Sequence, residues 1–410
     1  MLLLLSGCGL FDSLLEVEAP SQVAADELDD PSHANLLLTS AVSDFGCALP
    51  FYVLAGGLIG NELVESQNNV LTRDYDRRST TAGSPQYQST TCALGNQSNI
   101  GVYPPVATVR WETDNILRQL EEWTDAEVPN RSSRIATAAA YAGYSYILLG
   151  EAFCSAAVDL GPELTRAQVF ALAEERFGRA IAAAQAAGNT EMLNLALLGR
   201  ARTRLNLAKK AEAAADAQLV PTGFNKTAVY SNVAPRRENR VYTWNLRGKW
   251  ASVGPAYRGL TFGGVADPRV AVMNSGGKGN DGVTDLWTQS KYTSESTPIP
   301  FARAVEARLI VAEVQGGQTA VGIINALHSA AGLPPFNSTD PAQIQQQVVE
   351  ERQRELFLEG QRLGDVIRYN LPLLPAAGAP YPKGGVYGNQ ICLPLPDVER
   401  NNNPSLVVAH

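Results

Sequence analysis

Apolar side chains recur at helical spacing over two parts of the chain, residues 31–221 and residues 300–370. The second part divides into three helical stretches at Gly316-Gly317 and at Pro334-Pro335, residue types that end helices. We therefore expect a mainly α protein. In the first part, the spacing predicts helices over about 31–44, 106–123, 134–153, 166–189 and 195–219.

Two of these helices, 166–189 and 195–219, carry small and aromatic residues at the spacing typical of tetratricopeptide units. In such units, small residues let one helix approach the next closely. The positions concerned are Ala173, Phe177 and Ala180 in the first helix and Leu198, Gly199, Ala208 and Ala211 in the second. The predicted fold is a tetratricopeptide-like helical superstructure, an α-α superhelix, with an irregular loop-rich lobe.

Three segments lack a helical period, and the first of them interrupts the part 31–221. Residues 68–99 are rich in Ser, Thr, Asn, Gln and Tyr, which predicts a long surface loop. Residues 222–299 are rich in Gly, Asn, Ser, Arg and aromatics, which predicts an irregular lobe, and residues 371–410 form a proline-rich tail. We expect residues 1–19 to be a signal remnant and tether, and residues 20–410 to be a single domain with its helical frame at about 31–221 and 300–370.

The stretch EERQRELFLEGQRLGDVIRYN, residues 350–370, combines many charges with an apolar stripe. Paired carboxylates can perform acid and base chemistry on a sugar. Each acidic residue here, however, has a basic neighbour within one helical turn, as Glu351 has Arg354 and Glu359 has Arg362. We therefore interpret the stretch as a helix whose charges serve the scaffold.

Composition narrows the possible functions. The net charge of -8 argues against nucleic-acid binding, which requires a basic face. The chain lacks GxSxG, HExxH, P-loop and Rossmann motifs, so we expect neither an enzyme nor a bound cofactor. With only three histidines and no CxxC pair, the sequence supports no metal site.

The five cysteines indicate export. Residues 5–8, LSGC, have the form of a lipobox, which predicts lipidation at Cys8 and a protein anchored to a membrane by lipid without spanning it. The other four, Cys47, Cys92, Cys154 and Cys392, permit three disulfide pairings or four buried free thiols. Pairing Cys47 with Cys92 and Cys154 with Cys392 would tie loop regions to the helical frame.

A series of short motifs follows a fixed order along the chain. The motifs are the lipobox with Leu15-Glu16-Val17 and Pro20, Leu149-Gly150-Glu151, Asp267-Pro268-Arg269, Lys291-Tyr292, the run from Glu351 through Glu355, Glu359-Gly360, Arg362 and Asp365 to Arg368-Tyr369, Leu393-Pro394-Leu395-Pro396, and Asn403-Pro404. Their order resembles that of the SusD/RagB family. The chain departs from the family pattern at Leu358 and Leu363, where aromatics are common.

This resemblance implies a nutrient-binding lipoprotein on the outer face of the outer membrane. Members of the family cover a SusC-type TonB-dependent transporter and pass it oligosaccharides, or in some cases peptides. The chain is shorter than many members of the family, and we attribute the missing length to the ligand-binding lobe.

Sugar binding requires exposed aromatic faces beside hydrogen-bonding groups. The lobe at 222–299 supplies such residues, whereas Trp111 and Trp123 lie at helical spacing and are predicted to be core. Tyr75 and Tyr87, in the polar loop, form a candidate opposite wall. The predicted ligand-binding residues are Trp250 and Trp287 first, then Tyr292, Tyr257, Trp244 and Asn280; for each aromatic, packing of the lobe onto the helices is the alternative.

Two other function classes stay open from the sequence. A tetratricopeptide-like frame also suits a structural or protein-interaction scaffold that self-assembles on the cell surface. An all-helical glycoside hydrolase would need two unpaired carboxylates facing a cleft, and the pairing of most acidic residues disfavours it.

Overall fold

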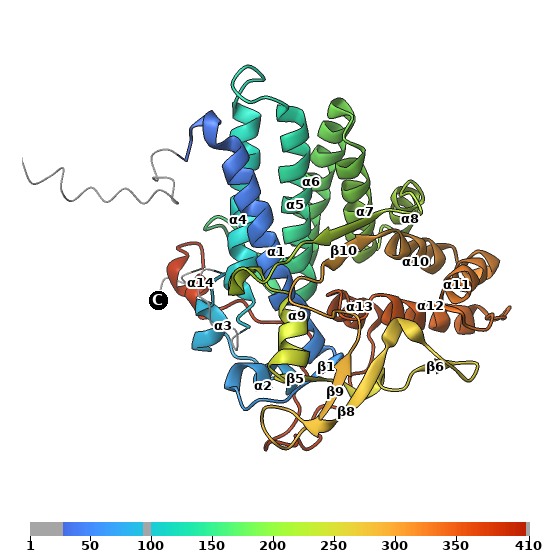
Figure 1. Cartoon of the computed structure of the whole chain (residues 1–410). Helices are drawn as coiled ribbons and strands as arrows, with labels where there is room; N and C mark the ends of the chain where they lie inside the picture. The colour runs from blue at the N-terminus through green and yellow to red at the C-terminus, as the bar shows by residue number, and fades with distance from the viewer. Residues whose placement is uncertain (1–27, 93–99, 407–410) are drawn as a thin grey trace, which may run out of the picture.

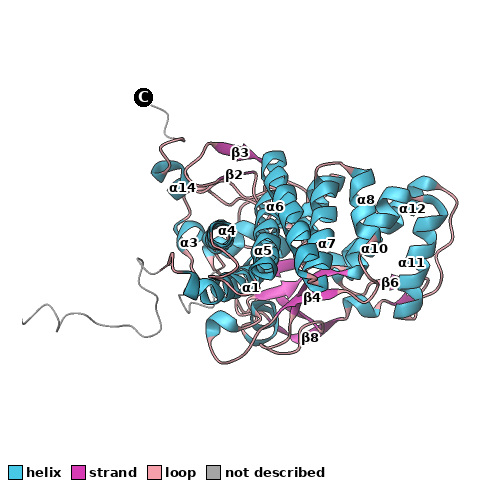
Figure 2. Ribbon diagram, turned by 90° about the horizontal axis from the view of Figure 1, so that it is seen from above, coloured by secondary structure: helices cyan, strands magenta, loops and turns pink. Residues whose placement is uncertain are grey.

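The computed structural model describes residues 28–92 and 100–406, and helices dominate it. A layer of long, roughly parallel helices forms the upper part of the molecule, and a second group of shorter helices extends from it (Figures 1 and 2). The mainly α prediction is confirmed. The first group is α1 (Ala34–Ile59), α4 (Tyr103–Glu122), α5 (Arg131–Ala152), α6 (Arg166–Ala187), α7 (Thr190–Asn206) and α8 (Lys210–Gln218), and the second is α10 (Ala304–Gln315), α11 (Gly317–Ala331), α12 (Pro341–Glu355) and α13 (Arg362–Tyr369).

Local sequence signals set the ends of the central helices. Helix α6 begins with a capping box, in which Thr165 and Gln168 satisfy each other's backbone N–H groups, and ends at Gly188, whose φ of 64° favours glycine. Asn189 then accepts a hydrogen bond from the N–H of Met192 and starts α7. The sequence predicted one helix over 195–219, but the chain turns at Ala208, where φ is 59°, and divides it into α7 and α8.

Helices α5, α6 and α7 pack around the Phe177 ring. Ala173, Phe177 and Ala180 are fully buried. A Cβ on Gly143 of α5 would lie 2.7 Å from this ring, and one on Gly199 of α7 would lie 2.3 Å from it. The prediction that Gly199 allows close helix approach is therefore confirmed.

The two later small positions are not packing positions. Ala208 and Ala211 are exposed because the turn after α7 places them at the surface. Helix α8 instead packs through Ala213, Ala214 and Ala217.

Gly199→Ala should lower the free energy of unfolding by about 1–3 kcal/mol, because the added methyl group has to displace Phe177 or one of the helices. The matched control is Gly178→Ala in α6, where a Cβ meets nothing within 4 Å. This control should raise the free energy of unfolding by about 0.5–1 kcal/mol, since alanine loses less backbone entropy than glycine in a helix. Urea unfolding of both variants checks the opposite signs; equal effects would contradict the packing described here.

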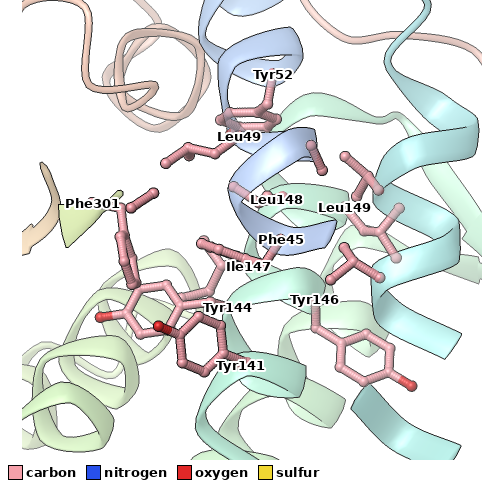
Figure 3. Packing of buried hydrophobic residues seen from close by; sticks show 14 of the residues in the cluster. Phe45, Leu49, Tyr52, Tyr141, Tyr144, Tyr146, Ile147, Leu148, Leu149 and Phe301 are labelled. Atoms are coloured by element: carbon pink, nitrogen blue, oxygen red, sulfur yellow. The ribbon is translucent and has the colours of Figure 1, made fainter. Parts of the chain in front are cut away.

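Helix α1 runs through the core, and it extends well past the predicted end near residue 44. It is long and apolar enough to cross a membrane by length and composition, but 78% of its most apolar window is buried within the protein. Phe45 packs against Tyr144 of α5 and Phe301 of β10 (Ile299–Arg303) in an aromatic cluster (Figure 3). Helix α1 thus acts as a core helix of the folded protein.

The lower part of the molecule is built from short antiparallel strand pairs and small helices (Figure 1). This region includes residues 222–299, which confirms that they form no long helix. The paired strands are β1 (Leu63–Glu65) with β5 (Ala251–Val253), β8 (Val272–Lys278) with β9 (Asp285–Gln289), β10 with β4 (Asn225–Ala228), β2 (Ser155–Ala157) with β3 (Glu163–Thr165), and β6 (Thr261–Phe262) with β7 (Val265–Ala266); the small helices are α2 (Val70–Asp76), α3 (Pro85–Ser89), α9 (Arg240–Tyr242) and α14 (Asp397–Asn402).

The charged stretch 350–370 is not one helix. Helix α12 ends at Glu355, and a tight turn with positive φ at Leu358 (55°) and Gly360 (82°) leads into α13. Glu351 and Glu359, predicted to be surface partners of nearby arginines, are buried and bind Arg269 and Lys291 from the lobe. This burial agrees with the interpretation of the stretch as scaffold. Its charged side chains, however, form ion pairs with distant segments and do not lie on an exposed helix surface.

Two disulfides are present, Cys47–Cys92 and Cys154–Cys392. They are one of the three pairings that the sequence left open. The first joins α1 to the segment after α3, and the second joins the end of α5 to the C-terminal tail. The predicted lipidation site, Cys8, lies outside the described residues.

Candidate functional site

A cavity of about 830 Å³ is lined by residues of β1, α2 and the turn after β5. These elements lie below the layer of long helices (Figure 1). Its size falls within the range of about 300–1,000 Å³ that small-ligand sites occupy. The C-terminal tail forms one wall, and the turn after β5 and the loop before β9 form others. Residues far apart in sequence line it: Asn61, Val64, Glu65, Asp76, Pro255, Ala256, Arg258, Val283, Thr284, Leu374, Pro375, Tyr381, Pro382, Lys383 and Tyr387.

A cluster of buried charges holds one side of this cavity together. Lys383 forms an ion pair with Glu65 and another with Asp281 at 2.6 Å. Asp76 accepts hydrogen bonds from the Glu65 N–H at 2.9 Å and from the Tyr381 hydroxyl at 3.0 Å. Burial raises the pKa of Asp76 to about 7. The cluster ties β1 and α2 to the tail and so fixes the cavity wall.

Aromatic and apolar side chains form another part of the wall, adjoining the charged cluster at Tyr381. Tyr381 and Tyr387 meet edge to face with ring centroids 5.0 Å apart, and the Arg78 guanidinium lies 4.9 Å from the centre of the Tyr387 ring. Val283 and Leu374 line the same cavity and are 66% and 71% exposed, so apolar surface remains open to a ligand.

Arg258 connects the cavity to one of the predicted aromatics. Its guanidinium donates two hydrogen bonds to the Val253 carbonyl, at 2.9 and 2.7 Å, and stacks over Trp287 at 4.9 Å. Because these contacts hold the guanidinium in place, it can present fixed donors to a ligand at little entropic cost. Burial lowers the pKa of Arg258 from its usual value, but the side chain remains a cation at neutral pH.

Three residues were wrongly predicted to bind a ligand. Trp244, Tyr257 and Tyr292 are buried, so their faces do not reach a ligand. Tyr257 stacks on Phe357 with centroids 4.8 Å apart, and the Tyr292 hydroxyl donates to the Leu358 carbonyl at 2.9 Å. Tyr257 and Tyr292 thus pack the lobe onto the 350–370 segment, and packing was the alternative for each aromatic.

The other three predicted residues lie nearer the surface. Trp250 is partly buried, edge to face with Trp244 at 5.6 Å, and Trp287 is partly buried beneath Arg258. Asn280 is exposed, and its backbone N–H donates to the Lys249 carbonyl at 2.8 Å. None of the three lines the cavity directly, so their role in binding stays a prediction.

The polar loop at 68–99 does not supply an aromatic wall. Asn69 caps α2 by accepting from the N–H groups of Leu71 and Thr72, and this short helix buries Tyr75. Tyr75 and Tyr87 are completely buried, with hydroxyls that donate to the carbonyls of Ile100 and Pro394. The prediction that they face a ligand is therefore wrong.

The tail residues Tyr381, Lys383 and Tyr387 were missed. They lie in YPKGGVY, a stretch whose Gly and Pro content indicated only loop structure. Two tyrosines and a lysine within seven residues of a loop were the available signal. Their partners, Glu65 and Asp76, lie about three hundred residues away in sequence, so periodicity and local motifs gave no sign of the cluster.

One family model matches part of the chain. Residues 237–407, less than half of the chain, match the model of the SusD family. The matched region contains much of the cavity wall, including Arg258 and the tail. No match is found among curated proteins.

Solved structures extend the SusD-like fold to nearly the whole chain. A SusD superfamily protein from Parabacteroides distasonis is 13% identical, with a TM-score of 0.67 over 94% of this chain and 99% of that one. A SusD-like carbohydrate-binding protein from Bacteroides vulgatus is 17% identical, with a TM-score of 0.63 over 87% and 86%. Surface glycan-binding protein A from Bacteroides thetaiotaomicron, solved with laminarihexaose, is 13% identical, with a TM-score of 0.62 over 92% and 98%.

Proposed function

We propose that this protein binds an oligosaccharide at the cell surface through the cavity between β1, β5 and the C-terminal tail. The observation that carries the proposal is this cavity of about 830 Å³, with apolar and aromatic walls beside fixed charges, in a chain with a SusD-like fold. The laminarihexaose bound to the similar Bacteroides thetaiotaomicron protein supports a glycan as the ligand class.

The cavity offers the two kinds of contact that a sugar needs. Pro255, Pro382 and Tyr387 supply apolar surface for the C–H faces of a sugar ring. Arg258, Thr284 and Lys383 supply groups that hydrogen-bond to hydroxyls. The proposal assigns the protein no catalytic role.

Further elements of the proposal rest on the family. We propose that Cys8 is lipidated, that the protein is anchored to the outer membrane facing the exterior, and that it delivers its ligand to a SusC-like TonB-dependent transporter. Co-purification of a TonB-dependent transporter with the membrane-bound protein, lost in a Cys8→Ser variant that is released from the membrane, tests these elements together. A peptide ligand remains the other class that family members accept.

Arg258→Ala should weaken oligosaccharide binding about tenfold, since it removes a hydrogen bond from a charged donor, worth about 1.5 kcal/mol. Calorimetric titration of the full chain with laminarihexaose, maltohexaose, cellohexaose and mannohexaose measures the affinity. The control is Arg400→Ala, which removes an equally charged side chain from an exposed ion pair with Glu163 outside the cavity.

The calorimetric titrations have three informative outcomes. A tenfold loss for Arg258→Ala, with Arg400→Ala unchanged, supports the cavity as the site. Binding that survives Arg258→Ala but is lost in Trp250→Ala would move the site to the exposed side of the lobe. A folded protein that binds none of the saccharides would overturn the proposed function.

A further inference from the structure

Trp111 is 50% exposed, although its place in a helical pattern predicted a core residue. Two residues along a helix correspond to a rotation of about 200°, so Trp111 points away from the buried side on which Val109 lies. Tryptophan is usually well buried, because its ring carries a large apolar area. An exposed ring in the middle of a rigid helix therefore requires an explanation.

The Trp111 ring forms part of a hollow of about 350 Å³ between α4 and α6, closed at one side by Asp159 in the turn after β2. We call this the α4–α6 hollow. It shares no lining residue with the cavity beside β1 and β5. It is therefore a separate feature, built entirely on the helical frame and its adjoining turn.

The polar groups of the hollow are held in fixed positions by one another. Arg176 pairs with Asp114 at 2.7 Å, and Arg110 pairs with Asp159 at 2.7 Å. The Tyr146 hydroxyl, from α5, donates to Asp114 at 2.5 Å and completes the support. Donors and acceptors thus line the same hollow as Trp111 and do not need to be ordered when a ligand binds.

The charge balance of the hollow disfavours an anion. Four guanidinium groups line it, and each lies within 3.0 Å of a carboxylate oxygen. An anionic ligand would have to compete with these carboxylates, and a cation would have to compete with the guanidinium groups. A neutral molecule with many hydroxyls avoids both costs, because each hydroxyl can accept from a guanidinium and donate to a carboxylate.

We propose that the α4–α6 hollow is a second saccharide site, which takes one or two residues of a neutral glycan with a sugar face on Trp111. The combination of an exposed indole face, paired charged groups of both signs and a volume suited to a small ligand carries the assignment. The site does not depend on the proposed function of the first cavity, although both would suit a protein that holds a long glycan at two points.

Fluorine NMR of the full chain labelled with 5-fluorotryptophan tests both sites in one experiment. The five tryptophans give separate signals, each assigned by a Trp→Phe variant. Trp111 reports on the α4–α6 hollow, and Trp287, beneath Arg258, reports on the first cavity. The probes are laminarihexaose, maltohexaose, cellohexaose and mannohexaose, with an oligogalacturonate as the charged comparison.

The expected result is a saturable shift of the Trp111 signal with at least one neutral hexasaccharide, unchanged by Arg258→Ala. Asp159→Ala should weaken this response about three- to tenfold, since it removes a hydrogen-bonding partner that is 60% exposed and leaves Arg110 with its longer ion pair to Asp114, at 3.8 Å. Asp125→Ala, at an exposed ion pair with Arg131 outside the hollow, should leave the response unchanged.

Other results would overturn the inference. A Trp111 signal that no neutral saccharide shifts, while the Trp287 signal responds, removes the second site and leaves the proposed function standing. If neither signal responds and calorimetry shows no binding, both fail. A shift with oligogalacturonate alone would mean that the hollow binds anions, which contradicts the charge argument.

Discussion

Asp365→Ala should lower the free energy of unfolding by about 3–5 kcal/mol, the largest effect that we expect from a single substitution in this protein. Asp365 accepts from Arg352 at 2.9 and 3.0 Å and from Arg368 at 2.8 Å. Arg352 is buried, and its remaining side-chain partner is Gln361 at 3.2 Å. Removing the carboxylate would therefore leave a cation in the core without its ion-pair partner.

The same substitution at the surface provides the control. Asp125 pairs with Arg131 at 2.8 Å, but its side chain is 78% exposed. Asp125→Ala should change the free energy of unfolding by less than about 1 kcal/mol, because water replaces the lost contact. Denaturant unfolding of both variants at pH 7 measures the contrast, and similar losses would contradict the role given to burial.

Acid should remove the difference in the free energy of unfolding between the wild type and Asp365→Asn. Burial alone would raise the pKa of Asp365, but Arg352 and Arg368 lower it below the usual value. A lowered pKa in the folded state adds stability that is complete above the unfolded pKa of about 3.9 and is lost as the pH falls through the folded value. The free energies of unfolding of the two proteins should therefore approach each other as the pH falls below about 3.9. A difference that does not change with pH would mean that the charge of the Asp365 carboxylate does not stabilise the fold.

The helical frame was predictable because its signals are local. Apolar periodicity, the capping box at Thr165 and the glycine at 188 act within a few residues, so they can be read from the sequence. Even the close contact at Gly199 followed from a spacing rule. Some helix ends were not predictable. Helix α1 continues through Pro50 because α4, α5 and the lobe cover it on most sides, and the turn at Ala208 divides the helix expected over 195–219.

The site was less predictable because it depends on contacts between distant segments. The sequence of a glycine-rich segment does not show whether its aromatic side chains pack inward or face a ligand. Tyr257 and Tyr292 pack inward against the turn at 356–360. Leu358 has a positive φ in the same turn, and a leucine in the sequence gives no local sign of that conformation. The charged residues around it therefore looked like helix-surface pairs when they are buried links between the frame and the lobe.

Loss of the Cys154–Cys392 disulfide should cost about 2–5 kcal/mol, and more than loss of Cys47–Cys92. The first bond closes a loop of 238 residues and the second a loop of 45. A longer loop restricts the unfolded chain more, and in the chain-entropy model this difference amounts to about 1.5 kcal/mol. Unfolding of the two Cys→Ser double variants, each compared with the oxidised wild type, measures the order.

The folded contacts around Cys392 argue that the effect acts mainly on the unfolded state. Cys154 donates its N–H to the Leu393 carbonyl at 2.9 Å, and Leu393 donates to Ala152 at 2.8 Å, so backbone hydrogen bonds hold the tail in place without the disulfide. The tail supplies Tyr381 and Lys383 to the cavity. The double variant at 154 and 392 should therefore lose stability but keep its oligosaccharide affinity within about threefold. A larger loss of affinity, or a greater cost for the shorter loop, would mean that the disulfide instead sets the folded position of the tail.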